Sequence, residues 1–190
     1  MFNYIKIKKN MKKQLVATIV GGLILFIWQF LSWSMLPVHQ SEYGYTPNQD
    51  KIMEVLTQNL TEEGTYMIPG VPPGSTQEQA QAAMDAGAGK PWASISYHKS
   101  MNTAMGMNMF RGFVVDLLAM YLLIWLLMKF SNLSMVTSIQ ASIAVGIIGY
   151  LTIPYLNTIW FETSSMGYLV DALVQWGLVG VWLGWYLPRN

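Results

Sequence analysis

The sequence contains no cysteine. This absence excludes disulfide bonds, catalysis by a thiolate and zinc sites built on cysteine. If the protein binds a soft metal ion such as Cu(I), the ligands must come from its 14 methionines and two histidines. The lack of cysteine does not identify the cellular compartment.

Charged residues are also scarce. They make up 11% of the chain, against about 25% in a typical soluble domain, while 53% of the residues are hydrophobic. This composition is typical of membrane proteins. The net charge of +1 conceals an asymmetry, because the first 13 residues hold five lysines whereas residues 37–110 hold seven acidic residues and three lysines. Nucleic-acid binding requires a basic surface, so we expect no nucleic-acid partner.

The common catalytic motifs are missing as well. The chain has no glycine-rich phosphate loop after a strand, no nucleophile elbow, and no HExxH or CxxC pattern. No histidine lies inside an apolar run, where haem ligation between helices would need one. We therefore expect no cofactor, and an enzyme is the less favoured class.

Four apolar runs are each long enough to cross a bilayer, which takes roughly 20 residues. They cover residues 14–36, 111–129, 134–153 and 168–187. The second run reads as the inner part of one helix over residues 94–130, because a single helical face continues through it. That face consists of His98, Met101, Met105, Met109, Gly112, Asp116 and Ala119. The sequence therefore predicts an all-α integral membrane protein with four transmembrane helices.

The charge asymmetry predicts the orientation. Residues 1–13 form a basic leader, and positively charged flanks favour the cytoplasmic side. Residues 37–93 and the loop 154–167 then lie outside, and both termini are cytoplasmic. The first run is too long for the core of a cleaved signal peptide, so we interpret it as an anchor in a bacterial-type inner membrane. Translation could begin at Met1 or at Met11.

The polar segment 37–93 contains six prolines, which exclude one regular element. We expect an irregular, partly helical extracytoplasmic segment. One short helix is predicted over residues 48–60, and a second one follows the capping pattern formed by Ser75 and Glu78. Because large apolar residues are few, we expect the segment to lie on the membrane helices or on a partner protein.

Ionisable residues inside a membrane span are costly and often functional. Asp116 and Asp171 each lie about one turn inside the outer end of a predicted span, with Arg111 before the first and Gln175 after the second. One interpretation is a structural clamp in which Arg111 neutralises an acid between the second and fourth spans. A second is a proton or cation site that opens to the outer face. The acids could also be interfacial residues that reach water, or they could contact a partner protein.

A second pattern consists of sulfur and imidazole donors at helical spacing. His98, Met101, Met105 and Met109 would share a face, and such donors suit Cu(I). Methionine is also an ordinary packing residue, so the same spacing is typical of a helix seam. His39 and His98 are each interpreted as polar surface.

Small residues mark two of the runs. Gly177, Gly180 and Gly184 lie in the last run, and Gly146 and Gly149 lie in the third. Such residues let helices approach closely, which predicts a protein partner or a homo-oligomer. The leading functional hypothesis is an accessory or assembly subunit of a larger membrane complex. The alternative is a small transporter or a copper-handling protein.

Overall fold

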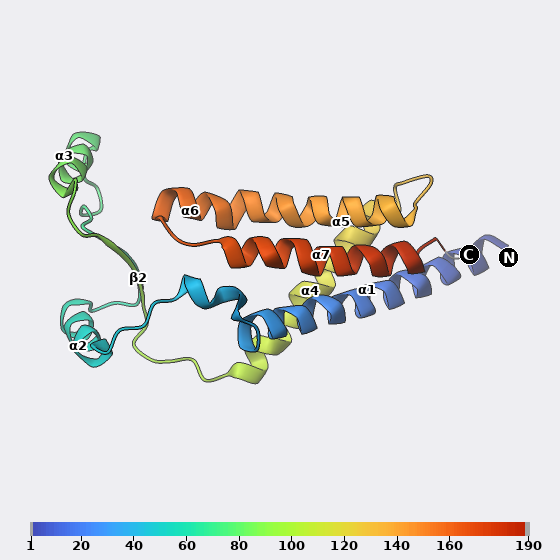
Figure 1. Cartoon of the computed structure of the whole chain (residues 1–190), viewed down its shortest axis with the longest axis horizontal. Coiled ribbons are helices and arrows are strands. Elements are labelled where there is room, and N and C mark those ends of the chain that lie inside the picture. Colours follow the sequence, from blue (N-terminus) through green and yellow to red (C-terminus); the bar gives the residue numbers. More distant parts are fainter. Residues whose placement is uncertain (1, 189–190) are drawn as a thin grey trace. The chain divides into compact units, whose positions relative to one another are not determined.

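The computed structural model describes residues 2–188, with side chains from residue 11 onward (Figure 1). The chain is mostly helical and divides into two compact units. One unit comprises the chain up to Gly44 together with the chain from Ala104 onward, and the other comprises Tyr45–Thr103. Most of the predicted basic leader lies outside the described side chains.

The first unit is a bundle of membrane-length helices. They are α1 (Phe2–Ser34), α4 (Met105–Leu127), α5 (Met135–Tyr150) with its continuation, and α7 (Met166–Tyr186). Four helical stretches are long and apolar enough to cross a membrane: Met11–Ser34, Met105–Leu127, Met135–Phe161 and Met166–Tyr186. The prediction of a multi-pass protein with four such helices is confirmed.

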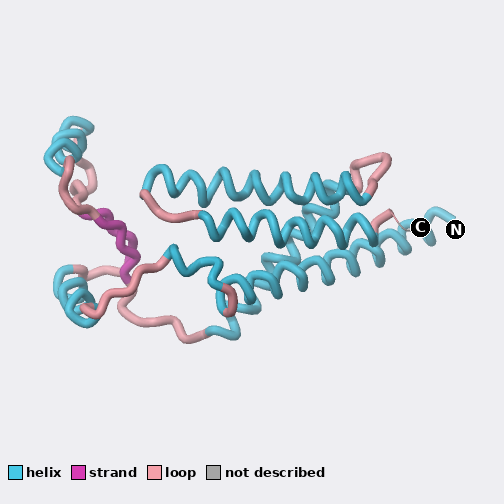
Figure 2. The backbone as a smooth tube through the Cα atoms, in the orientation of Figure 1, coloured by secondary structure: helices cyan, strands magenta, loops and turns pink. Residues whose placement is uncertain are grey.

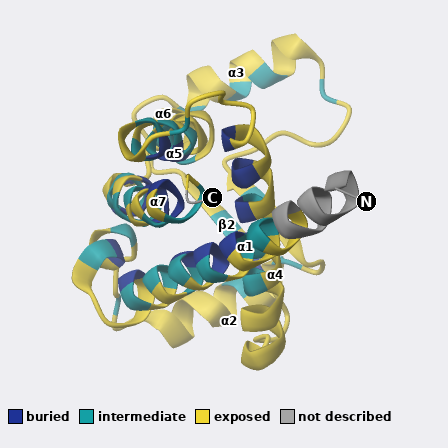
Figure 3. Ribbon diagram, turned by 90° about the vertical axis from the view of Figure 1, so that its right-hand side faces the viewer, coloured by how far each residue is buried: buried dark blue, intermediate teal, exposed yellow. Residues whose placement is uncertain are grey.

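Helix α7 packs along α5 on one side and along α1 on the other, and α1 in turn packs along α4. Figure 3 shows buried residues as stripes along α1 and α7. The apolar core between α1, α4 and α7 consists of Ala17, Leu25, Met120, Leu123, Ile124, Leu127, Val179 and Leu183. At Gly22 a Cβ atom would lie 2.8 Å from Cδ2 of Leu117, so α1 approaches α4 closely at this position.

The glycines of α5 and α7 serve the contact between these two helices. A Cβ atom on Gly180 would lie 2.7 Å from the Cα atom of Ile139, and one on Gly184 would lie 2.8 Å from the Cα atom of Met135. A Cβ atom on Gly146 would lie 2.6 Å from the carbonyl oxygen of Ala172. These three glycines therefore lie against the chain's own helices, while the predicted protein partner or homo-oligomer stays a prediction.

Gly149 and Gly177 differ from the other three predicted glycines. A Cβ atom at either position would meet no atom within 4 Å. They are the members of the predicted small-residue faces that stay open in the described structure.

The third span is longer than predicted. After α5 the chain forms one π-helical turn, η2 (Leu151–Tyr155), and continues as α6 (Leu156–Phe161). Pro154 was expected to end the helix at residue 153, but it lies inside the π-helical turn. Proline removes one helical hydrogen bond and crowds the preceding turn, and a wider π-helical turn accommodates both effects. The loop before α7 is correspondingly shorter than the predicted 154–167.

The second span begins later than predicted. Helix α4 starts at Met105, while residues Ala93–Tyr97 form strand β2 and not the start of a helix at Ser94. Strand β2 pairs with strand β1 (Gly64–Ile68) in an antiparallel register that places Gly64 opposite Tyr97. The pairing satisfies the backbone groups of residues 93–97 through a segment about 30 positions earlier in the chain. The helix predicted over residues 94–130 is therefore wrong in its first eleven positions.

The second unit contains this two-stranded sheet and two short helices (Figure 2). The helices are α2 (Gln49–Asn59) and α3 (Gln77–Gly87). Both were predicted, although the capping box of α3 is formed by Thr76 and Gln79 instead of Ser75 and Glu78. Neither helix has a buried residue.

The glycine contacts allow a matched pair of substitutions in one helix. We expect Gly180→Ala to destabilise the protein by about 1–3 kcal/mol, because the added methyl group meets the backbone of α5. Gly177→Ala should instead stabilise it by about 0.4–1 kcal/mol, because the position is open and alanine reduces the entropy of the unfolded chain. Thermal denaturation in detergent measures both effects. Equal shifts for the two variants would contradict the described contact between α5 and α7.

Candidate functional site at one end of the bundle

Beyond the end of α1 the chain turns back on the bundle. Residues Pro37–Glu42 form the 3-10 helix η1, whose first position is proline. Proline fits there because its fixed backbone angle suits a first helical turn and its missing N–H is not needed. The helix packs against both α1 and α7, and it buries His39, which is 5% exposed.

Both ring nitrogens of His39 face carboxylates. Nδ1 lies 2.8 Å from Oε2 of Glu42, and Nε2 lies 2.9 Å from Oδ2 of Asp171. The other oxygen of Asp171 accepts a hydrogen bond of 2.8 Å from Nε1 of Trp28 on α1. We call Trp28, His39, Glu42 and Asp171 the His39 cluster.

Aromatic rings enclose the imidazole. Trp33 stacks on it with ring centroids 3.8 Å apart and an interplanar angle of 11°. Tyr168 presents an edge at 5.2 Å and 72°. These two rings restrict the orientation of the imidazole plane. In this orientation the two ring nitrogens point to the two carboxylates.

The geometry favours a charged imidazole. A neutral ring has one N–H and can donate to only one carboxylate, whereas the imidazolium donates from both nitrogens. Burial on its own lowers the pKa of His39, but the bonds to Glu42 and Asp171 and the charges of these carboxylates outweigh it. The net effect raises the pKa of His39 above its ordinary value of 6.5.

A glycine on α7 makes room for this arrangement. A Cβ atom on Gly167 would lie 2.5 Å from Oε1 of Glu42, 2.6 Å from Nδ1 of His39 and 2.8 Å from the carbonyl oxygen of Val38. Any larger residue at this position would push η1 away from α7.

The second acid of the bundle is bonded separately. Nε2 of Gln29 donates a hydrogen bond of 2.9 Å to Oδ1 of Asp116 on α4. Oδ2 of Asp116 and Oε1 of Gln175 are buried and have no hydrogen-bond partner among the described residues. Trp28 and Gln29 are consecutive in α1, so adjacent positions of one helix serve acids on two different neighbours.

In the described structure Asp116 and Asp171 each bond to residues other than Arg111. Arg111 is exposed, and among the described residues it forms no ion pair with either acid. Asp171 is paired with His39 instead, and Asp116 with the neutral amide of Gln29. Arg111 is the basic residue nearest to Asp116 in the sequence, but sequence proximity does not determine the partner of a packed side chain.

Sequence reasoning missed four residues of the site. Trp28 and Gln29 lie in an apolar run, and His39 was interpreted as polar surface although it is buried. The available signal was local: Pro37 predicts a helical turn, and Glu42 lies three positions after His39, within reach across that turn.

The predicted copper ligands do not share one helix. His98 follows strand β2, Met101 lies in the connection to α4 and is 90% exposed, and Met105 and Met109 lie on α4. The helical face that motivated the copper hypothesis is therefore wrong for His98 and Met101. No group of three or more histidine, aspartate or glutamate side chains in the described part of the chain could hold a metal ion. Copper binding remains a hypothesis without its structural basis.

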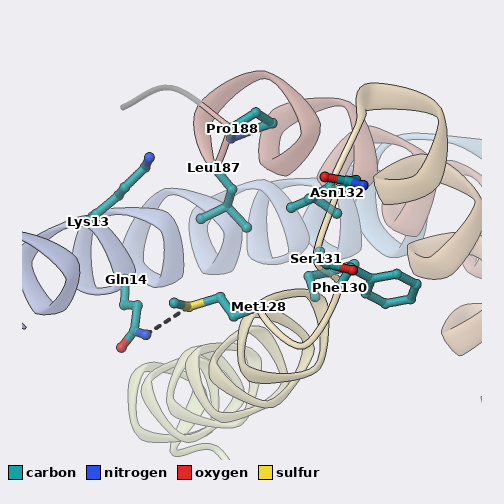
Figure 4. Close-up of a pocket in the computed structure, with 10 residues that line it drawn as sticks. Lys13, Gln14, Met128, Phe130, Ser131, Asn132, Leu187 and Pro188 are labelled. Carbon is teal, nitrogen blue, oxygen red and sulfur yellow. Dashed lines mark hydrogen bonds between the residues drawn. The ribbon is translucent and has the colours of Figure 1, made fainter.

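A cavity lies at the opposite end of the bundle from the His39 cluster. Its volume is about 400 Å³, and Figure 4 shows its lining residues from α1, the turn between α4 and α5, and the end of α7. Nε2 of Gln14 donates a hydrogen bond of 2.8 Å to the sulfur of Met128 at its edge. Lys13, Ser131 and Asn132 make this end polar.

Comparison with known proteins gives no relative: no protein-family model, curated protein or solved structure matches this chain.

The two histidines form a matched pair for testing the site. We expect His39→Ala to destabilise the protein by about 3–5 kcal/mol, because it leaves two carboxylates without their common donor. His98→Ala should change stability by less than about 0.5 kcal/mol, because this histidine is exposed. Arg111→Ala should also have little effect.

The pH dependence of the His39→Ala effect has a definite sign. Because the pKa of His39 is raised on folding, its contribution is fully present below pH 6.5 and is lost as the pH rises through the folded-state pKa. The difference in Tm between wild type and His39→Ala should be larger at about pH 6 than at about pH 9. A large loss of stability for Arg111→Ala and none for His39→Ala would reverse this assignment.

Proposed function

We propose that this chain is a multi-pass protein of a bacterial-type inner membrane that acts as an accessory or assembly subunit of a larger membrane complex. The observation that carries the proposal is the surface of the unit Tyr45–Thr103. Its helices α2 and α3 have no buried residue, and apolar side chains on them are open to water. These side chains include Ile52, Met53, Val55 and Met84.

The apolar residues of α2 are grouped on the helix. Ile52 and Val55 are three positions apart and therefore neighbours on its surface, and they are 46% and 57% exposed. Covering apolar surface contributes about 25 cal/mol per Å², so a protein partner on this face would gain stability from it. Gly149 in α5 and Gly177 in α7 are open positions at which a partner helix could also approach closely.

The proposed orientation follows from the two ends of the bundle. Lys12, Lys13 and Lys129 are at the end that holds the cavity, because Lys13 and Met128 line it together. Positive charge favours the cytoplasmic side, so the His39 cluster and the unit Tyr45–Thr103 belong outside. Both termini are then cytoplasmic.

Reporter fusions test this orientation. Fusions at Gly74 and Glu162 should report an outside location, and fusions at Asn132 and Asn190 an inside location, because one span lies between each of these points and the next along the chain. The measurement uses a reporter active only outside and one active only inside, at the same four positions. Any pair of neighbouring positions on the same side would contradict the orientation or the number of spans.

Purification tests the role as a subunit. The full chain is isolated in mild detergent, and bound proteins are quantified by mass spectrometry for wild type and for Ile52→Ser with Val55→Ser. We expect a stoichiometric partner that is lost in the double variant, because its apolar contact is removed. Gln58→Ser, an exposed polar change on the same helix, should retain the partner.

A small transporter is the second candidate, and Asp116 favours it. This acid is 5% exposed within a membrane span, it has a neutral donor at one oxygen, and its other oxygen has no described partner. Such a group is suited to bind a proton or a cation. The same purification distinguishes the candidates, because a bound ion or ligand without protein partners would favour transport over the role as a subunit.

A further inference from the structure

We propose that His39 is a proton-binding site that latches the segment Pro37–Glu42 onto α7, and that loss of the proton releases this segment. The ligand is the proton that converts the neutral ring of His39 into the imidazolium. In that form Nδ1 donates to one carboxylate and Nε2 to the other. This inference concerns the helix bundle alone and does not depend on the proposed role as a subunit.

The two contacts of His39 differ in what they connect. Glu42 lies three positions along the same short helix, so its bond to Nδ1 holds η1 together. Asp171 lies 132 positions away on α7, so its bond to Nε2 connects two elements. The second bond is the one that attaches η1 to the bundle.

Deprotonation is expected to break the bond to Asp171. A neutral ring keeps one N–H, and Asp171 retains a donor in Trp28, whereas Oε1 of Glu42 has no partner among the described residues. The neutral ring is therefore expected to carry its proton on Nδ1 and to donate it to Glu42. The lone pair of Nε2 then faces the carboxylate of Asp171, and this contact is repulsive.

No second cation compensates for the loss. The ionisable groups that face His39 are Glu42 on η1 and Asp171 and Tyr168 on α7, with Tyr43 close to Tyr168. From α1 the ring meets Trp33, which does not ionise. Among the described residues no lysine or arginine forms an ion pair with either carboxylate. The proton on His39 is thus the positive charge that holds the two acids together.

The direction of the switch follows from the same contacts. The raised pKa of His39 keeps the latch closed below pH 6.5, and the latch opens as the pH rises through the folded-state pKa.

Histidine NMR tests proton binding directly. The full chain, labelled with ¹⁵N in histidine and carrying His98→Gln, gives signals from His39 alone because the chain has two histidines. We expect a titration midpoint above 6.5 that falls by about one unit, a tenfold loss of proton affinity, in Asp171→Asn. The amide must present its oxygen to Trp28 and its NH₂ group to Nε2, which favours the neutral ring. Asp116→Asn, the same change at an acid bonded to Gln29, is the matched control and should leave the midpoint in place.

Cysteine labelling tests the release. The chain has no cysteine, so a single Val38→Cys reports on the half-buried face of η1 and a single Ser41→Cys provides an exposed reference. The ratio of maleimide labelling at position 38 to that at position 41 should rise as the pH rises through the His39 titration, when the two cysteines are placed singly in an otherwise wild-type chain. Gly167→Ala, which pushes η1 away, should give the high ratio at every pH. If Asp171→Asn does not fold, Gly167→Ala still tests whether release of η1 is detected.

Two results would overturn the proposal. One is a His39 midpoint at or below 6.5 that does not respond to Asp171→Asn. The other is a labelling ratio that stays constant with pH in wild type while Gly167→Ala raises it, because the probe would then detect release and the proton would not cause it.

Discussion

A buried acid in a membrane helix requires a hydrogen-bond donor, and α1 supplies one to each of its neighbours. Trp28 donates to Asp171 on α7, and Gln29 donates to Asp116 on α4. Consecutive residues of an α-helix point about 100° apart, so one helix placed between two others can reach both. The order in which α4, α1 and α7 pack is the order that satisfies both acids, and a different neighbour for α1 would leave one carboxylate unpaired in a low-dielectric environment.

The contact between α5 and α7 has another physical basis. Lipid chains are as apolar as leucine, so apolar side chains alone do not drive helices together in a membrane. Here Gly180 and Gly184 lie against Ile139 and Met135 at distances that exclude even a methyl group. Helix α7 thus joins a polar contact on one side to a close-packed contact on the other.

The sequence predicted those features that depend on local properties. Hydropathy and run length identified the four spans, and the rarity of acids in spans identified Asp116 and Asp171. The partners of these acids depend on packing, so the nearest charge in sequence, Arg111, was a poor guide. The partner His39 precedes Asp171 by 132 positions.

Two helix boundaries differ from those predicted. Methionines at helical spacing continue back to Met101 and predict an earlier start of the helix. Residues 93–97 instead form a strand that pairs with residues 64–68, and helix α4 starts only at Met105. Pro154 is a helix terminator in isolation, but the packed third span continues through it by a π-helical turn. In the first case the pairing with a distant strand outweighed the local preference.

The place of the His39 cluster along the bundle is consistent with its chemistry. A charged group costs several kcal/mol at the bilayer centre and less near the interface, where water can exchange a proton with it. His39 lies just beyond the end of α1, whereas Asp171 lies five residues inside the start of α7. The imidazole therefore brings a positive charge from the aqueous boundary to an acid that is within the span. A lysine or arginine at position 39 would neutralise the acid permanently, whereas histidine does so only while it holds a proton.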